Sequence, residues 1–260
     1  MNNLFIQAWP RTVSAAFCLV NSAALPLNKH KEIIYKGPIR FCIAKDFAML
    51  RYDSIAATPA SDYPFRNLIG ADILPPDQEA EIARDFPQID KTGFMRAEDF
   101  PMGPAFTALL AEVRSPEFAK AIGEKLGVDL TGKPTWVTVR KWSALKDGRA
   151  HTDGADKLAS ALIYLNKDGA SGGNLRFLEG PDQDGPGTAE VNPGYGHFIA
   201  FPRLDNSWHG HTSFEGERRV VQIAWLVSED AIARKAKRHG VTEFLKKLFS
   251  STKQNQPEMM

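Results

Sequence analysis

The stretch HTDGADKLASALIYLN, residues 151–166, begins with a polar corner and continues into the apolar run ASALIYL, whose length is typical of a buried strand. Short apolar or alternating runs also occur on both sides of it, separated by Gly, Asp, Asn and Pro. They are TWVTVRKW (135–142), GNLRFLE (173–179), HFIAF (197–201) and RRVVQIAWL (218–226). Several short strands with turn residues between them indicate an antiparallel sheet that closes into a sandwich or jelly roll. We therefore expect a mainly β fold with flanking α-helices.

The flanking helices have recognisable ends. DILPPDQEAEIARDFP predicts a helix that starts near Pro76 and stops at Pro87, because proline is favoured in the first helical turn and cannot continue a helix. SPEFAKAIGEKLG predicts a second helix, with Ser115 as N-cap and Gly127 as the terminating residue. Both helices are expected to support the sheet.

The chain from residue 46 to residue 260 is expected to form a single domain. Its parts are a helical support region (46–135), the jelly-roll core (136–228) and a C-terminal helical tail (229–260). Residues 1–45 are expected to be a leader of uncertain order. The run TVSAAFCLVNSAALPL after Arg11 weakly resembles a signal peptide, but it is too short and too polar to span a bilayer.

Composition narrows the classes of partner. Lys and Arg number 32 against 31 for Asp and Glu, so no overall field favours nucleic acid or a membrane surface. Cys18 and Cys42 match no metal or redox spacing, which favours a reducing, cytoplasmic location. We expect a small-molecule or peptidyl substrate, no nucleic acid and no membrane partner; the oligomeric state stays open.

Three histidines and one aspartate are candidates for a metal site. In an extended segment, residues two apart point to the same side, so His151 and Asp153 can reach one ion. A histidine from SWHGH would complete a set of two histidines and one carboxylate, an arrangement that suits Fe(II) and leaves coordination positions open. His209 and His211 share a face of an extended segment, so periodicity does not decide between them. Taken singly, each histidine is better explained as a structural, hydrogen-bonding residue of the core.

Two arginines open the last strand, RRVVQIAWL. Alternation places Arg218, Val220 and Gln222 on one face and Arg219 on the other, so one arginine should point inward. A buried guanidinium needs an anionic partner, and the fork of arginine matches a carboxylate. Solvent exposure of both arginines at the start of the strand is the alternative.

With these spacings, the sequence resembles the Fe(II)- and 2-oxoglutarate-dependent dioxygenases of the prolyl 4-hydroxylase type. His209 follows His151 by 58 positions, and Arg218 follows His209 by nine. IYLNKDGASGGNLRFLEG and FPRLDNSWHGH are also similar to segments of that family. The resemblance covers about 136–228 and implies a double-stranded β-helix, which is a jelly roll.

The resemblance also implies a role for each matched residue. His151, Asp153 and His209 would bind Fe(II), with His209 preferred to His211 because it keeps the spacing to the arginine. Arg218 would hold the distal carboxylate of 2-oxoglutarate. Arg219 is the second choice for this role, and Tyr164 would contact the same carboxylate or be an ordinary core aromatic. The implied cofactors are Fe(II), 2-oxoglutarate and O₂, with ascorbate as an optional reductant.

The implied reaction is hydroxylation of an unactivated C–H bond, with release of succinate and CO₂. Asp153 argues against a halogenase, in which halide replaces the carboxylate. The sequence departs from the family where a tyrosine often faces substrate or cosubstrate, because Lys141 or Trp142 stands there, so the substrate is not readable. Two alternatives remain: a non-redox, cupin-like metal-binding sandwich and a catalytically silent interaction domain.

Overall fold

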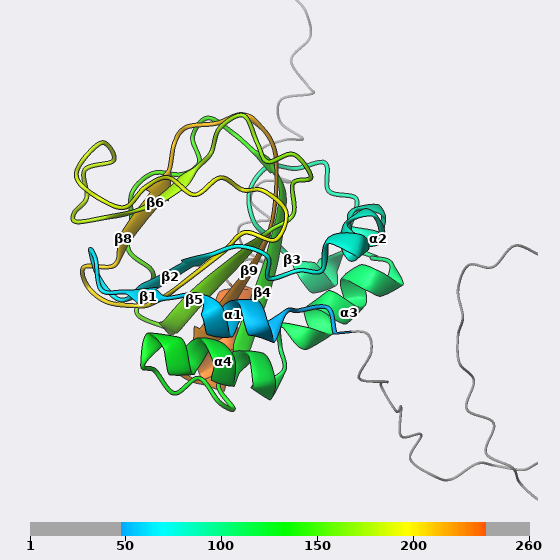
Figure 1. The fold of residues 1–260 in the computed structure, drawn as a ribbon, viewed down its shortest axis with the longest axis horizontal. Helices are drawn as coiled ribbons and strands as arrows, with labels where there is room; N and C mark the ends of the chain where they lie inside the picture. Colours follow the sequence, from blue (N-terminus) through cyan, green and yellow to red (C-terminus); the bar gives the residue numbers. More distant parts are fainter. Residues whose placement is uncertain (1–47, 238–260) are drawn as a thin grey trace, which may run out of the picture. The chain divides into compact units, whose positions relative to one another are not determined.

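The computed structural model describes residues 48–237, which all lie in one compact unit (Figure 1). Most of this part is β structure, in an antiparallel sheet of seven strands and a second sheet of two. The predicted mainly β, jelly-roll fold with flanking helices is confirmed. The predicted leader, 1–45, and the tail beyond residue 237 lie outside the described residues.

The large sheet has the strand order β1-β2-β7-β5-β9-β4-β3, and the small sheet pairs β6 with β8. The strands are β1 (Ala60–Ser61), β2 (Asn67–Gly70), β3 (Met95–Arg96), β4 (Thr135–Ser143), β5 (Lys157–Tyr164), β6 (Leu175–Leu178), β7 (Phe198–Pro202), β8 (Trp208–His211) and β9 (Gly216–Leu226). β5, which the apolar run predicted, lies between β7 and β9 and is buried along most of its length. Each of the five sequence runs that predicted strands overlaps one of these strands.

Alternation in β9 sends its side chains into two different layers. Val221, Ile223 and Trp225 pack into the core between the large sheet and the helices. Val220 packs into a second core between the large sheet and the small sheet, and Arg218 lies on this same face. The predicted separation of the two arginines is therefore confirmed: Arg218 is 1 % exposed, and Arg219 is half-buried on the opposite face.

The helices lie on one side of the large sheet and the small sheet lies on the other (Figure 1). The α-helices are α1 (Tyr52–Ala57), α2 (Glu79–Asp85), α3 (Pro104–Glu112) and α4 (Pro116–Leu126), with 3₁₀ turns η1 (Pro76–Gln78) and η2 (Ala97–Asp99). Both predicted helices are present. The Ser115 hydroxyl accepts a hydrogen bond from the backbone N–H of Phe118, and Gly127 ends α4 with a left-handed φ of 72°.

The region expected to be only a helical support also contributes strands. β1, β2 and β3 extend the two edges of the large sheet through main-chain pairing with β7 and β4. These strands are two to four residues long, too short to show a periodic pattern. The sequence therefore carried no signal for them, and the support region is part of the sheet as well as its cover.

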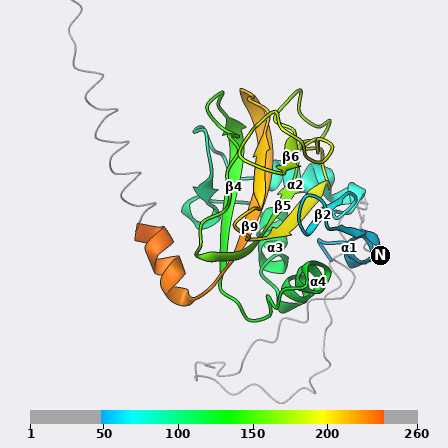
Figure 2. The same cartoon turned by 90° about the vertical axis from the view of Figure 1, so that its left-hand side faces the viewer.

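Residues 229–237 are helical and follow β9 (Figure 2, orange). Ala231 is buried against Trp136 and Leu226, so this helix covers the end of the β4–β9 pair. Across residues 48–237 the structure contains no helix that is both long and apolar enough to cross a membrane.

Candidate functional site

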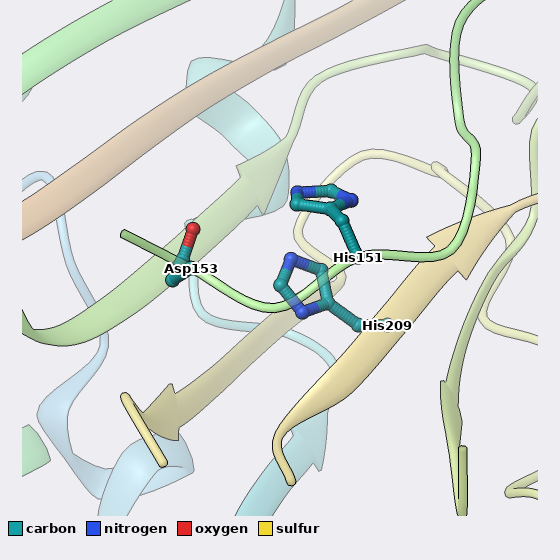
Figure 3. Close-up of side chains that lie close together, drawn as sticks. All are labelled: His151, Asp153 and His209. Atoms are coloured by element: carbon teal, nitrogen blue, oxygen red, sulfur yellow. The ribbon is translucent and has the colours of Figure 1, made fainter. Parts of the chain in front are cut away.

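His151 and Asp153, on the segment that leads into β5, lie close to His209 of β8 (Figure 3). One potential ligand atom from each residue lies within 4.8 Å of those of the other two. The backbone explains this closeness, because His151 and His209 exchange both N–H···O hydrogen bonds, each 3.0 Å long. The short bridge thus attaches the segment before β5 to β8, and Asp153, two residues on, faces the same space.

The hydrogen bonds of both histidines prepare them as metal ligands. The Nδ1 of His151 lies 2.9 Å from the carbonyl of Arg149, and the Nδ1 of His209 lies 3.0 Å from the carbonyl of Ser207. A carbonyl only accepts, so each Nδ1 carries a proton, and in the neutral imidazole the Nε2 keeps its lone pair. In metal sites, a hydrogen bond from the ring nitrogen that does not bind the metal orients the imidazole.

Charge states in the site also suit a cation. Burial lowers the pKa of His209 to about 4, so its imidazole is neutral at pH 7. Burial alone would raise the pKa of Asp153, but the charge of Lys157 and hydrogen bonds from Lys157 and Ser160 outweigh it and lower the pKa to about 2. A neutral nitrogen donor and an ionised carboxylate are the forms that bind a divalent metal.

Asp153 is held from two sides. The Nζ of Lys157 lies 2.6 Å from its Oδ1, and the Oγ of Ser160 donates to its Oδ2 over 2.6 Å. Each carboxylate oxygen has two lone-pair sites, so these contacts fix the side chain and leave room for a metal bond. The donor set therefore fits the Fe(II) that the sequence implied.

His211, the other candidate on β8, is not part of this group. Its Nδ1–H donates to the carbonyl of Thr212 over 2.8 Å, and its Nε2 accepts from the Nη1 of Arg140 over 3.3 Å. Of the two histidines, the structure brings His209 to His151 and Asp153 and places His211 beside Arg140.

Arg218 of β9 and Tyr164 of β5 are two buried side chains that contact each other. The Nε of Arg218 donates to the carbonyl of Gly173 over 2.9 Å, and its Nη2 lies 3.4 Å from the Tyr164 hydroxyl. Both side chains are buried, and burial raises the pKa of Tyr164, against the charge of Arg218. Among the residues that the structure describes, no carboxylate forms a salt bridge with Arg218.

A cavity of about 340 Å³ connects these groups. Its walls include all three residues of the metal group, His211, Arg218 and apolar side chains from both sheets, among them Leu162 and Leu175. Arg219, the second choice for the cosubstrate carboxylate, lies elsewhere. It packs against the ring of Phe86 and lines a separate cavity.

The sequence did not identify four polar residues of the site. Arg140, Lys157 and Gln222 line the cavity, and Ser160 donates a hydrogen bond to Asp153. Gln222 was placed on the Arg218 face but given no role. Arg140 is part of TWVTVRKW, and a charged residue within an otherwise apolar strand was the available signal. Lys141 and Trp142, which stand nearest the family's tyrosine, do not line the cavity.

Comparison with solved structures finds proteins to which this chain is similar. A Pseudomonas putida prolyl-4-hydroxylase is 22% identical, with 67% of this chain and 90% of that chain covered and a TM-score of 0.43. AviO1 from Streptomyces viridochromogenes Tue57 is 13% identical, with 70% and 97% covered and a TM-score of 0.42. A prolyl 4-hydroxylase from Phytophthora capsici is 17% identical, with 70% and 67% covered and a TM-score of 0.44.

No curated protein sequence matches the chain significantly. A family model does match it: residues 141–227 fit the 2OG-Fe(II) oxygenase superfamily. The matched segment runs from β4 to the end of β9 and contains His151, Asp153, His209 and Arg218. Over residues 141–227 the chain therefore resembles the 2OG-Fe(II) oxygenase superfamily.

Proposed function

We propose that this protein is an Fe(II)- and 2-oxoglutarate-dependent dioxygenase that hydroxylates an unactivated C–H bond of its substrate. The observation that carries the proposal is that one cavity contains both the His151, Asp153 and His209 group and the buried Arg218. The first group suits a metal and the second suits a carboxylate. The alternative, a non-redox, cupin-like metal-binding sandwich, would need the metal group but not the buried arginine.

His151, Asp153 and His209 would hold Fe(II) on one face and leave the remaining coordination positions open to the cavity. With 2-oxoglutarate and O₂, the bound metal supplies an oxidation that yields succinate, CO₂ and a hydroxyl group on the substrate. One oxygen atom of O₂ enters succinate and the other enters the hydroxyl, so the atoms balance. Ser160 and Lys157 keep the Asp153 carboxylate oriented.

Arg218 would bind the distal carboxylate of 2-oxoglutarate, with the Tyr164 hydroxyl beside it. This end of the cavity is buried, where a charged hydrogen bond is stronger than in water. Leu162 and Leu175 would exclude water from the cosubstrate. The chain's own residues thus position the two ends of a short dicarboxylate, one at the metal and one at Arg218.

The test is succinate formation by the purified full chain supplied with Fe(II), 2-oxoglutarate and O₂. Asp153→Asn keeps the size of the side chain and removes its charge, so it should abolish succinate formation while the circular dichroism spectrum stays unchanged. A matched variant is Asp205→Asn, whose carboxylate is exposed and pairs with Arg203 outside the cavity. It should form succinate at the wild-type rate.

Near-wild-type succinate formation by Asp153→Asn would contradict the metal assignment. Metal binding by the wild-type protein without any binding of 2-oxoglutarate would instead favour the cupin-like alternative. A folded protein that binds neither would favour the interaction domain.

A further inference from the structure

Arg140 is a second buried arginine in the proposed active-site cavity. It lies on β4 opposite Val220 of β9, so it shares the face of the sheet that carries Arg218. Its side chain is only 8 % exposed, and it lines the cavity together with the three residues of the metal group. The proposed function assigns no role to it.

The guanidinium of Arg140 is poorly satisfied by the protein. Its Nη1 contacts the Nε2 of His211 at 3.3 Å and the Oγ of Ser143 at 3.4 Å, both long contacts. The nearest carboxylate that pairs with it, Asp147, is 3.7 Å from Nη2. Within the described part of the chain, its buried Nε has no hydrogen-bond partner. Arginine has five N–H donors, so donor capacity is left over at this position.

The charges of the cavity walls also favour an anionic ligand. Its walls carry three cationic side chains, Arg140, Lys157 and Arg218, against one carboxylate, Asp153. A divalent metal would increase this positive excess, and the two charges of 2-oxoglutarate would only offset the metal. Burial and the charge of Arg218 lower the pKa of Arg140 to about 10, which still leaves it charged at pH 7. The loaded cavity therefore keeps a net positive charge, which Asp147, 3.7 Å from the Nη2 of Arg140, offsets only in part.

The shape of the cavity favours a small molecule as the carrier of that anion. About 340 Å³ is near the lower end of the range for small-molecule sites, roughly 300–1,000 Å³. The ring of Phe94 lies 4.3 Å from the Arg140 guanidinium carbon, and Leu175 adds a further apolar wall. An acid with a short apolar body would place its carboxylate on Arg140 and its carbon chain against these side chains.

We propose that Arg140 binds a carboxylate of the substrate, so that this enzyme hydroxylates a small carboxylic acid rather than a non-acidic internal residue of a polypeptide. The inference rests on the proposed function, because it takes one carboxylate of 2-oxoglutarate to be at Arg218 and the other to be at the metal. The fork of arginine matches a carboxylate with two parallel hydrogen bonds. An internal residue of a polypeptide offers such a group only when it is Asp or Glu.

The experiment measures binding of butyrate and of its neutral isostere butyramide by calorimetry. The full chain is first loaded with Mn(II), which replaces Fe(II) without turnover, and saturated with 2-oxoglutarate, which blocks butyrate from Arg218. We expect butyrate to bind roughly tenfold or more tightly than butyramide. Arg140→Gln should remove this preference, and Arg140→Lys should retain part of it because it keeps the charge without the fork.

Arg96→Gln is the matched control. Arg96 also has a buried Nε without a hydrogen-bond partner among the described residues, with a carboxylate, Glu98, 3.8 Å away. It also lies over an aromatic ring, that of Trp136, but it does not line the cavity. This variant should bind butyrate as the wild type does. Affinity for 2-oxoglutarate should change by less than about threefold in Arg140→Gln.

Equal binding of butyrate and butyramide, or unchanged butyrate binding by Arg140→Gln, would overturn the inference. So would a loss of 2-oxoglutarate affinity in Arg140→Gln as large as that in Arg218→Gln, because Arg140 would then belong to the cosubstrate site. Selective binding of inorganic phosphate in place of butyrate would overturn the carboxylate assignment. If Arg140→Gln does not fold, butyrate binding by Arg140→Lys as tight as by wild type overturns it. Failure of 2-oxoglutarate to bind the Mn(II) protein would count against the proposed function instead.

Discussion

Replacement of Arg218 by methionine should weaken the binding of 2-oxoglutarate and leave the stability of the fold nearly unchanged. The side chain is 1 % exposed and, within residues 48–237, forms no salt bridge with a carboxylate; its contacts are the carbonyl of Gly173 and the Tyr164 hydroxyl. Loss of a buried charge–carboxylate contact costs about 2–5 kcal/mol of binding free energy. At about 1.4 kcal/mol per factor of ten, Arg218→Met should weaken 2-oxoglutarate roughly thirty-fold or more.

Stability should respond differently. Methionine is similar in length and removes a buried charge that has no carboxylate partner, and replacement of buried charges by apolar groups is often neutral. The free energy of unfolding of the metal-free protein should therefore change by less than about 1 kcal/mol, because the lost hydrogen bonds are offset by the removed desolvation cost. Urea denaturation measures this quantity.

The assays are the 2-oxoglutarate dependence of succinate formation and, separately, calorimetric metal binding, which should be unchanged. Arg219→Met, on the opposite face of β9, tests the second candidate for the carboxylate and should leave 2-oxoglutarate affinity at the wild-type value. Unchanged affinity in Arg218→Met together with a large loss in Arg219→Met would refute the placement. A loss of several kcal/mol in stability would identify Arg218 as a structural residue.

Three further perturbations test the metal site and the fold. His209→Ala should lose iron binding in calorimetry and His211→Ala should keep it; the reverse order would contradict the ligand set. Hydrogen bonds from Arg84 and from the start of α3 lower the pKa of Asp85, so this carboxylate stabilises the fold above its unfolded pKa. Wild type should therefore lose more stability than Asp85→Asn as the pH falls below about 4, and parallel pH profiles would refute this. Phe118→Ala should cost about 3–5 kcal/mol in urea denaturation, because the ring is fully buried against β9; a cost below about 1 kcal/mol would contradict the packing.

The sequence was most informative where one face of an element is buried. Alternation in β9 separated Arg218 from Arg219, and the serine and glycine at the ends of α4 marked that helix, because both patterns depend on local geometry. The choice of His209 over His211, which periodicity left open, came from the resemblance to the dioxygenase family and its spacing to the arginine. These features follow from short stretches of chain.

Other features depend on contacts between distant segments. A β-bulge between Arg140 and Trp142 shifts the register of β4. Simple alternation along the strand therefore did not show which side chain of this stretch faces the cavity. Lys157 reaches Asp153 only because the turn between them folds back. The short strands β1 to β3 exist through pairing partners far away in the sequence. Local patterns carry no information about such pairings.

The most direct test of the account is an anaerobic titration of the full chain with Fe(II) and then 2-oxoglutarate, followed by visible absorption and by admission of O₂. We predict a weak charge-transfer band that appears only when Fe(II) and 2-oxoglutarate are both bound. We also predict conversion of 2-oxoglutarate to succinate once O₂ enters. Asp153→Asn should show neither signal. A wild-type protein that binds the metal but gives no band and no succinate would contradict the account.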